Sequence, residues 1–237
     1  MRYVISDIHG CYDEYKKLLT KINFSEQDEL YILGDVIDRG QNPIRLLQDI
    51  MHHPNIMLIL GNHEFMMYTI MKRMAVDITH ENFDKHLTLN DLLDYNLWLQ
   101  NGGQTTVEQF RKLDKLERMD LLEYLAESPL YEVIQYHEKQ YVLVHAGLGN
   151  FDPEKDLGEY ELDELLSERM DYSKRYYPDK NTFVITGHTP TIYIPGWEKP
   201  EVYQQNGHIA IDCGCAAGGR LAAYCIETEQ VTYVDKM

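Results

Sequence analysis

Apolar positions along the first third of the chain fall into short blocks that predict strands separated by helices. Continuous apolar runs predict strands at residues 3–5, 30–33 and 56–60. Apolar residues at helical spacing predict helices at residues 12–22, 43–50 and 64–74. Strands that are apolar along their whole length, with helices between them, indicate a sheet buried on both faces.

The pattern changes twice further along the chain. Residues 76–127 are mostly helical in pattern, and we interpret them as a helical insertion that is interrupted by Asn101-Gly102-Gly103. A leucine-rich stripe in this insertion favours packing into the core, although residues 76–101 as a cap over the site is an open alternative. The stripe consists of Leu92, Leu93, Leu97 and Leu99.

After Pro129 shorter apolar runs predict further strands, at residues 130–136, 141–144, 182–185, 209–211, 221–226 and 231–234. A chain of 237 residues without a linker-like stretch fits one domain, residues 1–237, better than two small ones. We therefore expect a single α/β domain.

Five short polar segments, each placed where an apolar strand ends, carry the candidate chemistry. They are residues 7–10, 34–40, 61–64, 145–147 and 187–188. The first three follow strands spaced by about one βαβ unit of roughly 30 residues, so right-handed crossovers bring these ends to one edge of the sheet. The segments offer carboxylate, imidazole and amide ligands without thiolate, a set that suits Mn, Fe or Zn. Any one segment alone is compatible with a turn, but all five together predict a metal site.

The net charge of the chain and the length of its apolar stretches limit the partners that we expect. A formal net charge of −17 makes non-specific binding to nucleic acid or to an anionic membrane unexpected. An anionic substrate would therefore need a local positive site made of metal ions or arginine. The first residues lack the apolar region of a signal peptide, and no stretch approaches the roughly 18 apolar residues that span a bilayer, so we expect a cytoplasmic protein.

The cysteines suggest a reducing environment. Cys11, Cys213, Cys215 and Cys225 are the four cysteines of the chain, and Cys213 and Cys215 are too close for an ordinary disulfide framework. We interpret all four as reduced, buried thiols. A thiolate metal site at Cys213 and Cys215 is the open alternative.

The five polar segments together resemble the ordered signature of the calcineurin-like metallophosphoesterases. More narrowly, they resemble the phosphoprotein phosphatase family in its compact bacterial and phage form, over roughly residues 3–214. The matching motifs are Asp7-x-His9-Gly10, Gly34-Asp35-x-x-Asp38-Arg39-Gly40, Gly61-Asn62-His63-Glu64, His145-Ala146-Gly147 and Gly187-His188. The resemblance implies a two-metal centre on a β-sandwich of mixed sheets flanked by α-helices.

The resemblance also implies which residues hold the metal ions. Asp35 would bridge the two ions, and Asn62 would contact both a metal ion and the substrate phosphate. Manganese is the expected metal, with iron or zinc as alternatives. The full set of implied ligands is Asp7 and His9 for the first ion, Asp35 for both, and Asn62, His145 and His188 for the second.

Four further residues would act on the substrate. Arg39 would hold phosphate oxygens, and Arg169, which follows a Leu-Leu pair, matches a second phosphate-binding arginine of the family. His63 would be the general acid that protonates the leaving oxygen, and Asp38 would orient it. The metal ions would generate the hydroxide that attacks phosphorus in line.

Two substrate classes fit this resemblance. The intact Asp38-Arg39 pair, together with Asn62-His63-Glu64, favours a phosphomonoester hydrolase, in particular a serine/threonine protein phosphatase that also accepts small phosphoesters. The alternative is a dinucleoside polyphosphate hydrolase, because small bacterial enzymes of that kind share the opening at residues 6–14 and the Asn-Gly-Gly element at 101–103. A non-catalytic binding module would have lost a ligand or His63, and none is missing. The sequence predicts no oligomeric state.

Two positions depart from the family pattern. Ser6 stands where the family has a glycine, and we expect the change to affect only the space around the backbone. Cys213 stands inside the Asp212 to Gly214 strand end, which resembles the family's Asp-x-Gly element. The sequence does not assign a role to Cys213.

Overall fold

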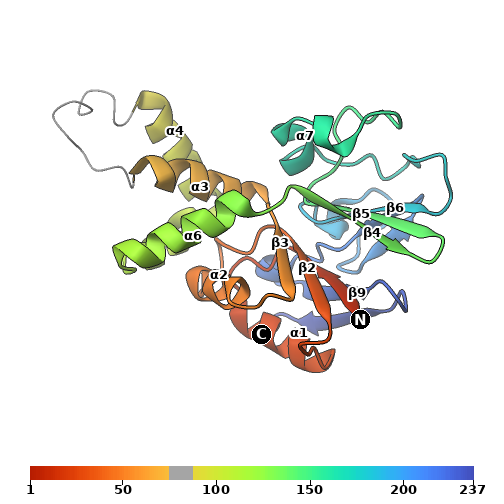
Figure 1. Ribbon diagram of the computed structural model, residues 1–237, viewed down its shortest axis with the longest axis horizontal. Coiled ribbons are helices and arrows are strands. Elements are labelled where there is room, and N and C mark those ends of the chain that lie inside the picture. Colours follow the sequence, from red (N-terminus) through yellow and green to blue (C-terminus); the bar gives the residue numbers. More distant parts are fainter. Residues whose placement is uncertain (75–87) are drawn as a thin grey trace.

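The apolar runs form two five-stranded mixed sheets in the computed structural model, which describes residues 1–74 and 88–237 (Figure 1). The first sheet has the order β10-β9-β1-β2-β3, with β1 at Arg2–Ile5, β2 at Glu29–Leu33, β3 at Ile56–Ile59, β9 at Arg220–Cys225 and β10 at Val231–Asp235. The second has the order β4-β5-β6-β8-β7, with β4 at Tyr131–Tyr136, β5 at Lys139–Val144, β6 at Thr182–Thr186, β7 at Tyr203–Gln205 and β8 at His208–Ala210.

Each sheet contains three neighbouring parallel strands. In the first sheet β1, β2 and β3 are parallel, joined by α1 (Tyr12–Lys21) and α2 (Pro43–Met51). In the second sheet β5, β6 and β8 are parallel, while β4 and β7 pair antiparallel at the edges. The carboxyl ends of each parallel set therefore share one edge, as the spacing of the polar segments predicted.

Alternating side chains along the strands build the core on both sides of each sheet. Val4, Leu33 and Ile59 point between the sheets, where they meet Leu143 and Ile185 of the second sheet. Their neighbours along the strands, such as Ile5 and Ile32, face the other way and pack under the helices. This alternation follows from the two-residue period of a strand and explains why the predicted strands are apolar on both faces.

Helices flank the sandwich. In Figure 1, α1 and α2 lie against the first sheet, while α3 and α6 extend together with α4 to one side. Their bounds are α3 Asn62–Met74, α4 Leu89–Trp98, α5 Gln104–Phe110, α6 Lys115–Glu127 and α7 Leu162–Leu166, with a π-helical turn η2 at Leu99–Gly103 and 3₁₀ turns η3 at Leu157–Glu159, η4 at Thr191–Tyr193 and η5 at Cys215–Ala217. Among the described residues, none of the helices is long and apolar enough to cross a membrane.

The helical pattern of the middle of the chain is confirmed from Leu89 to Glu127, whereas residues 75–87 of the expected insertion lie outside the described residues. The prediction that its leucine stripe packs into the core holds for Leu99, which packs against the core cluster, and is wrong for the other three leucines. Leu92, Leu93 and Leu97 are 49%, 57% and 55% exposed. The helix buries its other side instead, through Trp98, which is fully buried. A helical stripe shows which residues share a face, but not whether another element covers that face.

Candidate metal centre

The six predicted ligands all lie at the carboxyl ends of parallel strands. Asp7 and His9 follow β1, Asp35 follows β2, and Asn62 begins α3 just after β3. The second sheet contributes His145 after β5 and His188 after β6.

The backbone at several of these strand ends is strained. Asp7, His9, Asp35 and His188 have φ values of 49°, 46°, 54° and 60°, in the left-handed region that side chains other than glycine rarely adopt. Each such residue costs on the order of 1 kcal/mol or more, and this kind of strain clusters at functional sites. The strain therefore marks this edge as the candidate site.

Asp35 lies at the middle of the cluster. Its Oδ2 atom is 3.5 Å from His9 Nε2, and its Oδ1 atom is 3.4 Å from His145 Nε2. Two groups of donor atoms, each within 4.8 Å of one another, share this carboxylate: His9 with Asp35 and His63, and Asp35 with His145 and His188. A carboxylate with one oxygen toward each sheet is suited to bridge two ions.

Backbone carbonyls fix the orientation of two imidazoles. The Nδ1–H group of His9 donates to the Ile37 carbonyl at 2.9 Å, and that of His145 donates to the Leu33 carbonyl at 2.7 Å. Both rings therefore present the lone pair of Nε2 to the carboxylate of Asp35. The lone pairs of the imidazole nitrogens and of the carboxylate oxygens thus face each other without a proton between them. This arrangement fits cations that are held between nitrogen and oxygen ligands.

The electrostatics of the histidines agree with this fit. Burial lowers the pKa of His9 to about 3 and that of His188 to about 4, and it also lowers the pKa of His145. The three rings are therefore neutral at physiological pH, which is the form that binds metal. The Oδ1 atom of Asn62 lies 2.9 Å from His145 Nε2 and 3.1 Å from His188 Nδ1, so the amide joins the same group.

Asp7 and Asp212 form a second pair of buried carboxylates beside this group. Asp7 Oδ2 accepts a hydrogen bond from the His188 backbone N–H at 2.9 Å. A Cβ atom at Gly187 would lie 2.2 Å from the same oxygen, so only glycine fits there. Burial and the neighbouring carboxylates raise the pKa of Asp7, and burial raises that of Asp212 to about 7, with a contribution from Asp35. A divalent cation would stabilise the ionised forms.

Glu64 organises the loop that carries Asp35, a role that the sequence did not reveal. Its carboxylate is fully buried and accepts hydrogen bonds from four backbone N–H groups, those of Asp35, Val36, Ile37 and Gly61. Burial, together with the charge of Asp35, raises the pKa of Glu64 to about 7. The sequence placed Glu64 in the Gly61-Asn62-His63-Glu64 motif and at the start of a predicted helix, but neither signal assigned it this role.

His63 and Asp38 form the predicted pair. The Nδ1–H group of His63 donates to Asp38 Oδ2 at 2.6 Å, and both side chains are buried. Burial works to lower the pKa of His63, but the carboxylates of Asp35 and Asp38 outweigh it and raise the pKa above the ordinary value. The Nε2 atom is the one that faces Arg39.

The two predicted arginines flank the centre. The guanidinium of Arg39 donates to His9 Nε2 at 2.6 Å, and its other terminal nitrogen lies 3.0 Å from His63 Nε2. Arg169 is exposed in the loop after α7, and its positive charge contributes to lowering the pKa of His188. That loop packs on the turn after His145, because a Cβ atom at Gly147 would lie 2.7 Å from the Glu168 carbonyl oxygen.

The cysteines take no part in the centre. All four are free and buried, as predicted. Cys213 lies between the sheets, while Cys215 belongs to the cluster on the other face of the first sheet, where it is hydrogen-bonded to Cys11. In the part of the chain that the structure describes, the groups able to hold a metal ion contain no cysteine, so a thiolate site at Cys213 and Cys215 is not supported.

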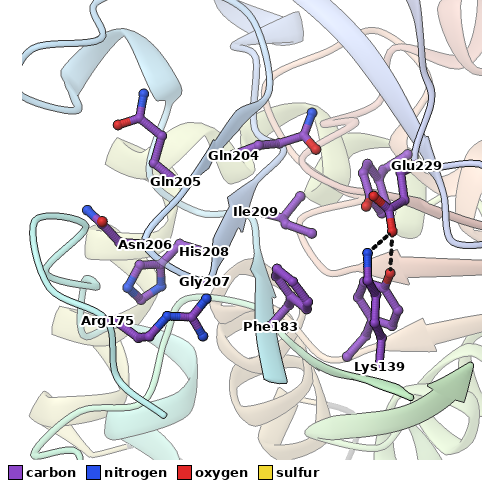
Figure 2. A pocket seen from close by; sticks show the side chains of 12 residues that line it. Lys139, Arg175, Phe183, Gln204, Gln205, Asn206, Gly207, His208, Ile209 and Glu229 are labelled. Atoms are coloured by element: carbon purple, nitrogen blue, oxygen red, sulfur yellow. Dashed lines mark hydrogen bonds and ion pairs between the residues drawn. The ribbon is translucent and has the colours of Figure 1, made fainter. Parts of the chain in front are cut away.

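A cavity of about 250 Å³ lies at the opposite ends of β5, β6 and β8 (Figure 2). Lys139, Phe183 and His208, at or next to the starts of these strands, line it, and none of the predicted site residues does. Lys139 forms an ion pair with Glu229 there. The cavity is thus separate from the candidate centre.

Comparisons with known proteins agree with the geometry. The family model for calcineurin-like phosphoesterases matches residues 2–191. A bis(5'-nucleosyl)-tetraphosphatase of Halalkalibacterium halodurans, PrpE, named as asymmetrical, is 25% identical over 252 residues, covering 93% of this chain and 87% of that protein.

Solved structures share the fold. A structure described as a candidate diadenosine tetraphosphatase has a TM-score of 0.67 at 18% identity and covers 100% of this chain and 93% of that chain. A serine/threonine phosphatase of Saccharomyces cerevisiae has a TM-score of 0.57 at 15% identity, covering 99% of this chain and 79% of that chain. At these identities both likenesses show the fold alone, and they confirm the predicted α/β sandwich flanked by helices.

Proposed function

This chain belongs to the calcineurin-like phosphoesterase family and is a hydrolase of phosphoric ester bonds, and we propose that its substrate is a dinucleoside polyphosphate such as diadenosine tetraphosphate. The observation that carries the proposal is the similarity to PrpE, which extends over 93% of the chain. The sequence alone favoured a phosphoprotein over this substrate. That ranking relied on the intact Asp38-Arg39 pair, which serves phosphoryl transfer with either substrate and so does not discriminate between them.

The residues of the strand ends would hold two divalent ions, with Asp35 between them and manganese as the expected metal. His9 and Asp7 would serve one ion, and the group around His145 would serve the other. Bound ions supply Lewis acidity, which lowers the pKa of water and neutralises charge on the phosphate oxygens. The neutral imidazoles, whose Nε2 lone pairs face the carboxylate of Asp35, support this assignment.

The side chains around the ligands would then act on the polyphosphate. Arg39 and Arg169 provide positive charge at the rim of a protein with a net charge of −17, so they would draw the polyphosphate to this edge. The fork of Arg39 suits bidentate contact with phosphate oxygens. Hydrolysis would form a bond from a water oxygen to one phosphorus, release a proton of that water to solvent, and break the phosphoanhydride bond to the leaving nucleotide. His63 Nε2 would give a proton to that leaving oxygen, while Asp38 holds Nδ1.

A side-by-side kinetic measurement tests the substrate. Manganese-loaded protein is assayed with diadenosine tetraphosphate and with a phosphoserine peptide under identical conditions. We expect kcat/KM to be about 100-fold higher for the dinucleotide, because a site built for one polar substrate rejects another strongly. Unequal products, ATP and AMP, would match the asymmetrical relative. A phosphopeptide cleaved as efficiently as the dinucleotide would contradict the proposal.

A further inference from the structure

Asp38 has two buried partners besides His63. The indole N–H of Trp98 donates to Asp38 Oδ2 at 2.7 Å, the same oxygen that accepts from His63. The hydroxyl of Thr106 donates to Asp38 Oδ1 and accepts from the Asp38 backbone N–H at 3.0 Å. Asp38, Trp98 and Thr106 are all fully buried. The carboxylate is thus held at both oxygens, away from solvent.

Both partners come from the middle of the chain, far from the strand ends in sequence. Trp98 is the last residue of α4 and Thr106 lies in α5, with η2 between them. The glycines of η2 allow the close approach: a Cβ atom at Gly103 would lie 2.7 Å from the Trp98 indole, and one at Gly102 would lie 2.6 Å from Arg39 Cγ. The Gly102 carbonyl also accepts from the Arg39 backbone N–H at 3.0 Å. The Asn-Gly-Gly element therefore packs this segment onto Asp38 and Arg39.

We propose that Trp98 and Thr106 are positioning residues for proton donation by His63, acting through Asp38. A carboxylate held by His63 alone would be free to rotate, and the imidazole would rotate with it. Two buried donors fix the plane of the carboxylate, so that His63 Nε2 points at the leaving oxygen. The proton moves from Nε2 to that oxygen, while Nδ1–H stays on the ring and Asp38 stays ionised. The inference rests on the proposed phosphoryl hydrolysis and adds the helical segment to it.

Conservative variants separate this role from a purely structural one. Trp98→Phe removes the indole N–H, and Thr106→Val removes the hydroxyl while keeping the shape. Thr105→Val is the matched control, because Thr105 Oγ1 is buried and has no hydrogen-bond partner among the described residues. Tyr95→Phe is a second control, because it removes a hydroxyl from a ring that packs edge-on against Trp98. The centroids of the two rings lie 6.3 Å apart.

The readout is kcat and KM for phenyl phosphate, whose leaving group needs a proton, and for dinitrophenyl phosphate, whose leaving group does not. We expect Trp98→Phe and Thr106→Val to lower kcat on phenyl phosphate about 10-fold, with KM unchanged and less than about twofold loss on dinitrophenyl phosphate. Thr105→Val and Tyr95→Phe should match the wild type on both. In a His63→Asn background, neither positioning variant should lower kcat further, because the donor is already gone.

Equal losses on the two aryl phosphates, or continued losses in the His63→Asn background, would overturn the inference. Failure of the substrate proposal looks different: the wild type would hydrolyse aryl phosphates but not diadenosine tetraphosphate. Proton NMR gives a readout besides activity, through the low-field signal of the His63 Nδ1–H···Asp38 hydrogen bond. That signal should shift or vanish in Trp98→Phe and Thr106→Val but not in Thr105→Val. An unchanged signal in all variants would also overturn the inference.

Discussion

The two ends of the parallel strands handle charge in opposite ways. At the carboxyl ends, Asp7, Asp35 and Asp38 are buried, and their φ values are 49°, 54° and 69°. At the amino ends of β5, β6 and β8, which line the cavity of Figure 2, Lys139 pairs with Glu229 from the turn between β9 and β10. Their side chains are 35% and 46% exposed. The carboxyl ends therefore hold buried charges on a strained backbone, whereas the charges at the amino ends are partly exposed to solvent.

This difference indicates which end of the strands contains features that lower the stability of the fold and are typical of a functional site. Buried carboxylates and left-handed residues destabilise a chain unless something else holds them in place. Here Glu64 supplies that support, because it binds four backbone N–H groups of the loops around Asp35. At the cavity, by contrast, the charged pair Lys139 and Glu229 is partly exposed. A hollow in the surface is therefore a weaker sign of function than buried, organised charge.

The largest effect should come from the central carboxylate. Asp35→Asn leaves the shape intact but removes the charge that faces His9 and His145, so we expect kcat to fall by about 10³-fold or more. Asp28→Asn makes the same change at the amino end of β2, where the carboxylate pairs with the chain terminus at 2.7 Å. That control should stay within about twofold of the wild type in steady-state assays. Similar losses in both variants would erase the contrast between the two ends.

Glu64→Gln should have the next largest effect, on stability. In this variant an NH₂ group replaces one carboxylate oxygen of Glu64 and cannot accept hydrogen bonds from the backbone N–H groups that it faces. We therefore expect a loss of roughly 2–3 kcal/mol in the free energy of unfolding of the metal-free protein. Metal affinity should also fall, about 10-fold or more, because the loop of Asp35 loosens. Urea unfolding and a manganese titration measure the two effects. Glu123→Gln, at an exposed position of α6, should change neither.

Asp212 should make the stability of the metal-free protein depend on pH. Burial raises the pKa of Asp212 in the folded protein to about 7, above the ordinary value of 3.8, so its protonated form stabilises the fold. That contribution disappears as pH rises from about 4 to 7. Over this pH range the free energy of unfolding should fall by about 1–2 kcal/mol less in Asp212→Asn than in the wild type. Urea unfolding at several pH values, with the exposed Asp120→Asn as control, measures it. Identical pH profiles for wild type and Asp212→Asn would contradict the assignment.

The smallest effect is expected at the amino ends. Lys139→Ala removes an exposed ion pair with Glu229, and such pairs contribute about 0–1 kcal/mol. Activity and metal content should stay at the wild-type level. A loss of activity above about twofold would show that the cavity of Figure 2 communicates with the centre, and the contrast between the two ends would fail.

The sequence predicted the strand ends well because their pattern is local. Each apolar strand ends in polar residues, and parallel pairing brings Asp7 and Asp35 to one edge of the first sheet. His145 follows β5 of the second sheet, so the packing of the two sheets brings it to Asp35. The strand β7 was missed, since a three-residue edge strand with exposed Gln204 and Gln205 has too little apolar pattern to detect.

The partners of the site residues were harder to predict. Glu64 acts through four backbone groups whose positions depend on the folded loop. Trp98 and Thr106 reach Asp38 from about 60 residues away in the chain, and only the packing of the Asn-Gly-Gly turn brings them there. The burial of α4 was predicted wrongly because its leucines have the spacing of a core helix, whereas the helix buries its Trp98 side.

Metal stoichiometry tests the central claim most directly. The wild type and Asp35→Asn are dialysed to equilibrium against manganese, and the bound metal is measured per chain. The organised charge at the carboxyl ends predicts two ions per chain in the wild type and a clear loss in Asp35→Asn, with Asp28→Asn unchanged. Fewer than two ions in the saturated wild type, or full occupancy in Asp35→Asn, would contradict a two-metal centre bridged by Asp35.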